Sequence, residues 1–191
     1  MKSKKGLIIG LIILTIVVVG ATYAYYMWKS TSNINVSVKL GGCVVTFNGG
    51  SNITGSLVPV AAKESGIKKD VTVKATESGS TMSLYLTLTT IPSELKDKSF
   101  TYELYYNGST LVKKGNFAAY NASSNTSGIT YASSGTTTLT LFTDRAVNTT
   151  TDKYTLYLWI NGKDYTNPKA MQSKTFSFNL YATGKNATLN S

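Results

Sequence analysis

Strict alternation of apolar and polar residues is the feature that most constrains this chain. Beyond residue 30, apolar side chains recur at every second position in successive segments, and turn-forming glycines and asparagines separate the segments. A period of two places alternate side chains on opposite faces of a strand, so each segment predicts a half-buried strand. The predicted strands are residues 33–40, 43–47, 70–74, 82–90, 99–106, 109–114, 136–142, 154–160 and 174–182.

Strands that each bury one face are accommodated most simply by two sheets packed face to face. The sequence therefore predicts an all-β fold, a β-sandwich of about nine strands of jelly-roll or immunoglobulin-like type. Asn107-Gly108 favours a two-residue type I′ hairpin, because both positions tolerate positive φ. Residues 92–98 are predicted as a helix-like insert, and residues 121–135 as a long polar loop.

The N-terminus follows a different pattern. Residues 7–28 form an apolar run behind three lysines. As a helix this run would extend about 33 Å, enough to cross a bilayer core of about 30 Å. The basic flank predicts a cytoplasmic N-terminus and an exported remainder. We therefore predict a hydrophobic helix in residues 1–29, a signal peptide or an N-terminal transmembrane anchor, and an extracellular β-sandwich domain in residues 30–191.

The same residues also fit a leader that is removed after export. The apolar stretch 7–20 is followed by Ala24, a small residue, with Thr22 two positions earlier. This order is typical of a signal peptide cut between Ala24 and Tyr25. Two localisations follow: a single-pass protein of the cell membrane held through residues 7–28, or a protein that is secreted after cleavage.

Composition argues against enzymatic chemistry. The chain has no histidine and one cysteine, Cys43. Without histidine there is no Ser-His-Asp or Cys-His arrangement and no H-E-x-x-H zinc site, and no glycine-rich phosphate loop is present. The aspartates show no calcium-loop spacing, and the acidic residues lie in or beside polar segments, as surface charges do. We predict no enzymatic activity, no catalytic residue, no cofactor and no metal site, with Cys43 as a small buried hydrophobe.

The net charge is +10, and four of the 19 basic residues flank the apolar run. The remaining basic side chains are scattered rather than gathered on one stripe with aromatic residues between them. A nucleic-acid-binding surface usually shows such a stripe, so no nucleic-acid partner is predicted. A mildly basic surface of this kind suits anionic cell-wall or membrane polymers.

Aromatic residues stand out on the polar side of two predicted strands. Tyr85, Tyr157 and Trp159 have the opposite parity from the leucines beside them. They are candidates for an aromatic patch on an outer face, suited to glycans or to another subunit. The simpler interpretation is that a loop covers this face.

Three stretches resemble the TasA/camelysin family, the biofilm-matrix fibre proteins of Gram-positive bacteria. Residues 20–41, GATYAYYMWKSTSNINVSVKLG, resemble the segment that ends the signal and opens the mature chain in that family. Residues 56–88 and the closing KTFSFNLYATGKN are similar to a central block and to the final strand. The resemblance implies a jelly-roll-like sandwich, cleavage between Ala24 and Tyr25 by a dedicated signal peptidase, and assembly by donor-strand exchange.

The N-terminal alternating segment fits such a donor strand on physical grounds. Ile34, Val36, Val38 and Leu40 share one face of a predicted strand near the N-terminal end of the exported region, and such a strand can augment an exposed sheet edge. The sequence therefore predicts a non-enzymatic exported surface or matrix protein, a fibre-type subunit that assembles with itself or with a cell-surface polymer. The alternative is a membrane-anchored adhesin or glycan-binding β-sandwich module.

Overall fold

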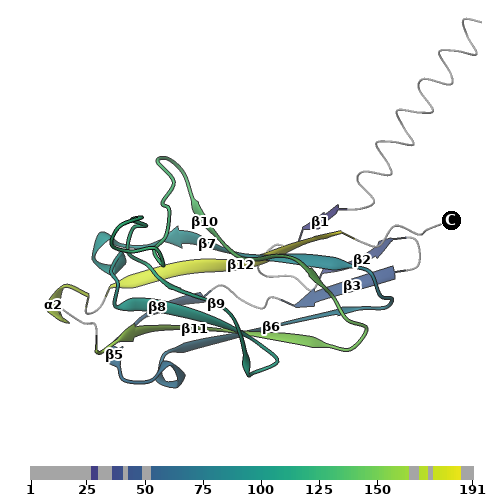
Figure 1. Ribbon diagram of the computed structural model, residues 1–191, viewed down its shortest axis with the longest axis horizontal. Helices are drawn as coiled ribbons and strands as arrows, with labels where there is room; N and C mark the ends of the chain where they lie inside the picture. Colours follow the sequence, from purple (N-terminus) through teal and green to yellow (C-terminus); the bar gives the residue numbers. More distant parts are fainter. Residues whose placement is uncertain are drawn as a thin grey trace, which may run out of the picture.

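The computed structural model describes residues 27–29, 36–40, 43–48, 53–163, 168–171 and 174–185, with only the backbone described before residue 49. These residues are mostly strand and form two sheets, which confirms the all-β prediction (Figure 1). The strands are β1 (Met27–Lys29), β2 (Val36–Leu40), β3 (Cys43–Asn48), β4 (Ile53–Ser56), β5 (Pro59–Val60), β6 (Ile67–Ala75), β7 (Thr81–Thr90), β8 (Phe100–Tyr106), β9 (Thr110–Asn116), β10 (Thr137–Ala146), β11 (Asp152–Asn161) and β12 (Thr175–Lys185).

The two sheets differ in size. The five-stranded sheet has the order β1-β12-β7-β10. β4 pairs with the same edge of β12 as β1 does, but at the N-terminal end of β12, whereas β1 pairs at its C-terminal end. The seven-stranded sheet has the order β2-β3-β6-β11-β8-β9, and β5 pairs in parallel with the end of β11. All other named pairings are antiparallel, as expected for strands that expose one face to water.

The predicted strand faces form the core between the sheets. Every second residue of β7 from Met82 to Leu88 is buried, as the leucine alternation predicts, and β12 follows the same pattern. β11 buries its inward series and also Thr155 and Trp159 on the opposite face. Phenylalanines fill the centre, where the rings of Phe100, Phe117 and Phe178 lie 4.2 to 6.2 Å apart. Such packing of aromatic rings contributes about 0.5–1.5 kcal/mol per pair beyond the apolar area that it buries.

The segments between strands confirm part of the prediction. The helix-like insert contains a short 3-10 helix, η2 (Ser93–Leu95). Two further helical turns, η1 (Lys63–Ser65) and α2 (Pro168–Met171), were not predicted. The loop 121–135 has no named strand, yet Asn125 and Ile129 within it are buried, so it is not a purely polar surface loop.

The β8–β9 hairpin corrects one expectation. Asn107 and Gly108 have positive φ, as predicted. However, Tyr106 pairs with Thr110, so the loop holds three residues and not the two of a type I′ turn. A register shift within the same hairpin, between Leu104 and Tyr105, accompanies the longer loop. A three-residue loop is the next most common hairpin connection after the two-residue turns.

The predicted leader lies almost wholly outside the described residues. Its last three residues are described, and they form β1 of the five-stranded sheet. The first described strand thus lies within the range 1–29. Among the described residues, no helix is long and apolar enough to span a bilayer. Ala24, Tyr25 and Ile34 are not described, so the predictions that concern them stay predictions.

Candidate functional site: the sheet edges and the outer face around Trp159

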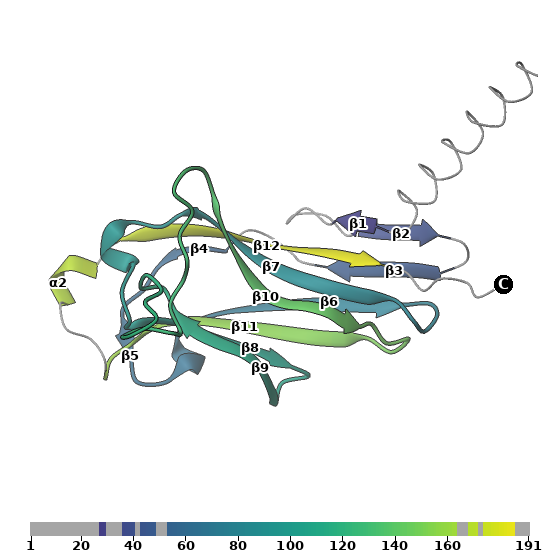
Figure 2. The same cartoon turned by 45° about the horizontal axis from the view of Figure 1, so that its top comes forward.

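The N-terminal strands both lie at sheet edges. β1 is the edge strand beside the C-terminal end of β12, with Met27 opposite Lys185 and Lys29 opposite Thr183. β2 is the edge strand of the other sheet and pairs with β3 from Val36 to Leu40. Both strands lie at one end of the molecule, close to the end of β12 (Figure 2). One N-terminal segment therefore supplies an edge strand to each sheet.

The structure places the predicted donor strand within this arrangement. Val36, Val38 and Leu40 form part of β2, which pairs within its own chain, while Ile34 lies outside the described residues. The predicted donor segment is thus an edge strand in the single chain. This position is the one required of a strand that leaves its own sheet and joins another.

The opposite edges of the two sheets carry features that discourage strand addition. β10 has two register shifts, between Thr140 and Phe142 and between Phe142 and Arg145, and Asp144 within it has a φ of 47°. Such irregularities twist an edge strand away from a partner. β9 exposes Lys113 and Lys114, and lysines on an edge strand oppose pairing with a second chain.

The candidate aromatic residues do not form one patch. Tyr85 lies in β7 of the five-stranded sheet and stacks on Tyr181, with ring centroids 5.0 Å apart. Tyr157 and Trp159 lie in β11 of the seven-stranded sheet, where the Tyr157 ring meets Tyr105 edge-on at 6.0 Å. The structure therefore brings Tyr157 together with Trp159 but not with Tyr85. Parity along a strand cannot reveal this, because it does not say to which sheet the strand belongs.

Trp159 is largely covered, as the simpler interpretation predicted. Its side chain is only 9% exposed although it faces outward from β11. The turn η1 and the following Gly66 pack against it. A Cβ on Gly66 would lie 2.6 Å from the Trp159 Cβ and 2.4 Å from the carbonyl oxygen of Leu158, so the close approach requires glycine.

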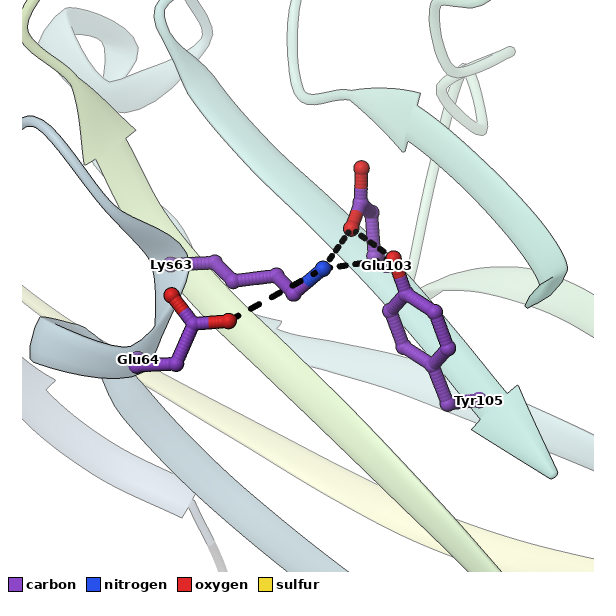
Figure 3. A network of polar contacts seen from close by, with 4 residues as sticks. All are labelled: Lys63, Glu64, Glu103 and Tyr105. Atoms are coloured by element: carbon purple, nitrogen blue, oxygen red, sulfur yellow. Dashed lines mark hydrogen bonds and ion pairs between the residues drawn. The ribbon is translucent and has the colours of Figure 1, made fainter. Parts of the chain in front are cut away.

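A polar network holds this turn against the sheet (Figure 3). The Lys63 ammonium donates to the Tyr105 hydroxyl at 2.6 Å and to Glu103 Oε2 at 3.1 Å. The Tyr105 hydroxyl in turn donates to Glu103 Oε2 at 2.7 Å. The hydrogen bond to Tyr105, together with the bond and charge of Glu103, raises the pKa of Lys63 above its ordinary value although burial lowers it. The ammonium also lies 4.2 Å from the centroid of the Tyr105 ring, a favourable cation–π distance.

Both carboxylates near Lys63 form ion pairs with its ammonium. Glu64 Oε1 lies 3.9 Å from the Lys63 ammonium, and the Glu64 side chain is mostly exposed. Glu103 is bound on the other side of the same cation. Within the described part of the chain, no group of three or more metal-ligating side chains comes together.

Comparison with known proteins adds no assignment to this geometry. No family model matches the sequence, and no curated protein matches it either.

Proposed function

We propose that this chain is a non-enzymatic exported surface or matrix protein, a fibre-type subunit that assembles by β-strand addition. The observation that carries the proposal is that the N-terminal segment contributes an edge strand to both sheets. A segment at the edges can exchange between molecules while the strands that hold the described core stay paired. The resemblance of residues 20–41 to TasA/camelysin proteins agrees with this proposal.

Exchange would replace contacts within a chain by the same contacts between chains. β1 would leave its three residue pairs with β12 and form them with β12 of a neighbour, and β2 would do the same with β3. Because the contacts are identical, such swapping is a low-cost route to assembly, and repeated in one direction it produces a fibre. The backbone hydrogen bonds supply the affinity, as in other cases of β-augmentation.

The unequal edges give this assembly a direction. The far edges, β9 and β10, carry exposed lysines and register shifts that oppose pairing. Addition is therefore confined to the side where β1 and β2 lie. A subunit that could add strands at both sides would aggregate as extended sheets instead of forming a defined fibre.

The strand order supports a sandwich of the jelly-roll type rather than the immunoglobulin-like type. β4-β12-β7-β10 faces β6-β11-β8-β9, which is an eight-stranded core in two sheets. In this order, consecutive strands alternate between the sheets for most of the chain. β1, β2 and β3 are then additions at the N-terminus, which is consistent with a separate role for them.

Cleavage between Ala24 and Tyr25 suits this mechanism better than a retained anchor. It would leave β1 intact and give it a free N-terminal end only two residues before Met27. A retained helix over residues 7–28 would have to share Met27 and Trp28 with β1. We therefore place the exported form outside the cell, with residues 1–24 acting during export.

A disulfide placed across β1 and β12 tests the exchange. Lys29 and Thr183 are directly opposite each other, and opposite residues of an antiparallel pair have Cα atoms about 4.5–5.5 Å apart, within the range for a disulfide. The full chain carrying Lys29→Cys and Thr183→Cys, with Cys43→Ser, is expressed in a secreting bacterial host. Oxidation before assembly should close the bond within each chain and prevent fibres, and reduction should restore them.

The control places the same bond where no exchange is proposed. Thr54 and Ser177 are opposite each other in β4 and β12, and a disulfide at Thr54→Cys and Ser177→Cys should leave assembly unchanged. Oxidation after assembly should link different chains at the Lys29–Thr183 pair but not at the Thr54–Ser177 pair. Fibres that form normally from chains locked at Lys29–Thr183, or bonds that are always intrachain at this pair, would contradict the proposal.

A further inference from the structure

The outer face of the seven-stranded sheet carries a groove that strand exchange does not use. The groove has a volume of about 670 Å³ and lies over β8, β9 and the end of β11. A second hollow of about 290 Å³ shares Glu103, Trp159, Asn161 and Lys163 with it and extends toward η1. Volumes of 300–1,000 Å³ are typical of sites that hold one small ligand or one unit of a polymer.

The groove is positively charged. Lys98, Lys114 and Lys163 line it, whereas its one acidic residue, Glu103, is already bound to Lys63. Among the residues that the structure describes, Lys114 and Lys163 form no ion pair. The ammonium of Lys98 donates to the carbonyl oxygen of Ser124 at 3.1 Å, which holds this lysine at the rim. Lysines without an ion pair to any described residue favour an anionic ligand.

The groove also offers a small exposed part of Trp159 and a fixed hydrogen-bond acceptor. Trp159 lines both hollows, and a ligand can contact only the 9% of its surface that stays exposed beside η1. Glu103 is held at Oε2 by Lys63 and Tyr105, while its other oxygen points away from both partners (Figure 3). A carboxylate oxygen fixed in this way can accept a hydrogen bond from a ligand hydroxyl without losing side-chain freedom on binding.

We propose that this groove binds an anionic saccharide, one pyranose unit of an acidic polysaccharide. The ligand's charged group would lie between Lys114 and Lys163, a ring hydroxyl would donate to Glu103, and an apolar edge of the sugar would contact the exposed part of Trp159. A polyanion without sugar rings can satisfy the lysines but not Trp159 and Glu103. A neutral saccharide can satisfy Trp159 and Glu103 but not the lysines.

The proposed site is independent of the fibre mechanism. The groove lies on β8, β9 and β11, and β3 and β6 separate these strands from the edge strand β2. A fibre formed through β1 and β2 would leave the grooves exposed along its length. Repeated weak sites on one fibre would then bind a polysaccharide much more tightly than one subunit does.

Charge reversal in the groove provides the first test. The full chain, purified in a mild detergent, is titrated with polygalacturonate, an uncharged dextran and polyphosphate. Lys114→Glu combined with Lys163→Glu should weaken polygalacturonate binding about tenfold or more, because two attractive charge contacts become repulsive; tenfold corresponds to about 1.4 kcal/mol. The matched control is Lys113→Glu, the same change on the neighbouring residue of β9, which does not line the groove and should have little effect.

Tryptophan fluorescence provides the second test without altering the groove. With Trp28→Phe, Trp159 is the remaining tryptophan, and polygalacturonate should shift its emission and protect it from acrylamide.

Glu103→Gln should weaken polygalacturonate binding but leave polyphosphate binding unchanged. Three outcomes would overturn the proposal. They are equal affinity for polyphosphate and polygalacturonate, no change in the Trp159 emission when polygalacturonate is added, and an equal loss of polygalacturonate affinity in the Lys113 variant and the Lys114/Lys163 variant.

Discussion

Removing the charge of Lys63 should loosen the turn that covers Trp159. Lys63→Met keeps most of the aliphatic stem but removes the donor to Tyr105 at 2.6 Å and to Glu103 at 3.1 Å. The hydrogen bond from Tyr105 to Glu103, at 2.7 Å, can persist, so Glu103 is not left without a donor. The loss should therefore be that of the Lys63 contacts alone.

The magnitude follows from how far the pair is buried. The side chains of Lys63 and Glu103 are 25% and 21% exposed, which lies between a surface pair, worth about 0.2–1 kcal/mol, and a buried pair, whose disruption costs about 3–5 kcal/mol. We expect Lys63→Met to lower the free energy of unfolding by about 1.5 kcal/mol. Because the pKa of Lys63 is raised, this contribution is complete below the ordinary lysine value of 10.5 and declines only at higher pH.

Urea denaturation measures the free energy of unfolding. Acrylamide quenching of the Trp159 fluorescence, in a Trp28→Phe background, measures how far the turn shields Trp159 from solvent. Lys63→Met should increase the quenching. The matched control is Lys68→Met, whose side chain is 51% exposed and reaches Asp70 only at 3.9 Å, so its effect should stay within about 0.5 kcal/mol. Equal destabilisation by the two variants, or unchanged quenching in Lys63→Met, would refute the role given to Lys63.

Three further outcomes follow from other contacts. Asp152, 1% exposed, accepts a hydrogen bond from the Tyr106 hydroxyl at 2.7 Å, so Asp152→Ala should cost about 3 kcal/mol and Tyr106→Phe about 1.5 kcal/mol in urea unfolding. The hydrogen bond from Lys174 lowers the pKa of Glu94 from 4.5 to about 2. The ionised Glu94 therefore contributes its full stabilisation above pH 4.5, the pKa of the unfolded chain, and this contribution is lost as the pH falls toward 2. Urea unfolding midpoints measured across this pH range should depend less on pH in Glu94→Gln than in the unaltered protein. Gly115→Ala should lower the melting temperature, because a Cβ there would lie 2.5 Å from a tyrosine hydroxyl and 2.7 Å from a backbone carbonyl oxygen.

The fold was predictable from the sequence where burial imposes a period of two. All nine predicted strands are present among the described residues. The alternation of burial that the period implies is clearest in β12, where every second side chain is buried. β4 and β5 were missed because they have only four and two residues, too few to show a period. β1 was missed because its three residues, MWK, continue the apolar run of the predicted leader. Cys43 begins β3, but its predicted burial stays a prediction because its side chain is not described.

The groove was only partly predictable. Parity predicts that Tyr157 and Trp159 alternate with the buried residues of their strand, but the partners of these residues come from distant parts of the chain. Lys63 and Glu103, for example, are 40 positions apart and meet only because β8 and η1 both lie beside β11. Two charged residues in polar segments give no signal of such a meeting in a single sequence.

The two proposed surfaces should respond separately to mutation, because they lie on different strands. Lys114→Glu with Lys163→Glu leaves β1, β2 and their pairing partners unchanged, so the full chain should still form fibres, but fibres that bind polygalacturonate poorly. Chains locked by a disulfide at Lys29→Cys and Thr183→Cys should fail to form fibres, yet each should bind as well as an unlocked single subunit. Sedimentation of secreted material with and without polygalacturonate measures both properties in one assay. If the lysine variant loses fibres as well, or the locked chain loses binding, the groove and the exchanging edges belong to one interface, and the separation drawn from the strand order is wrong.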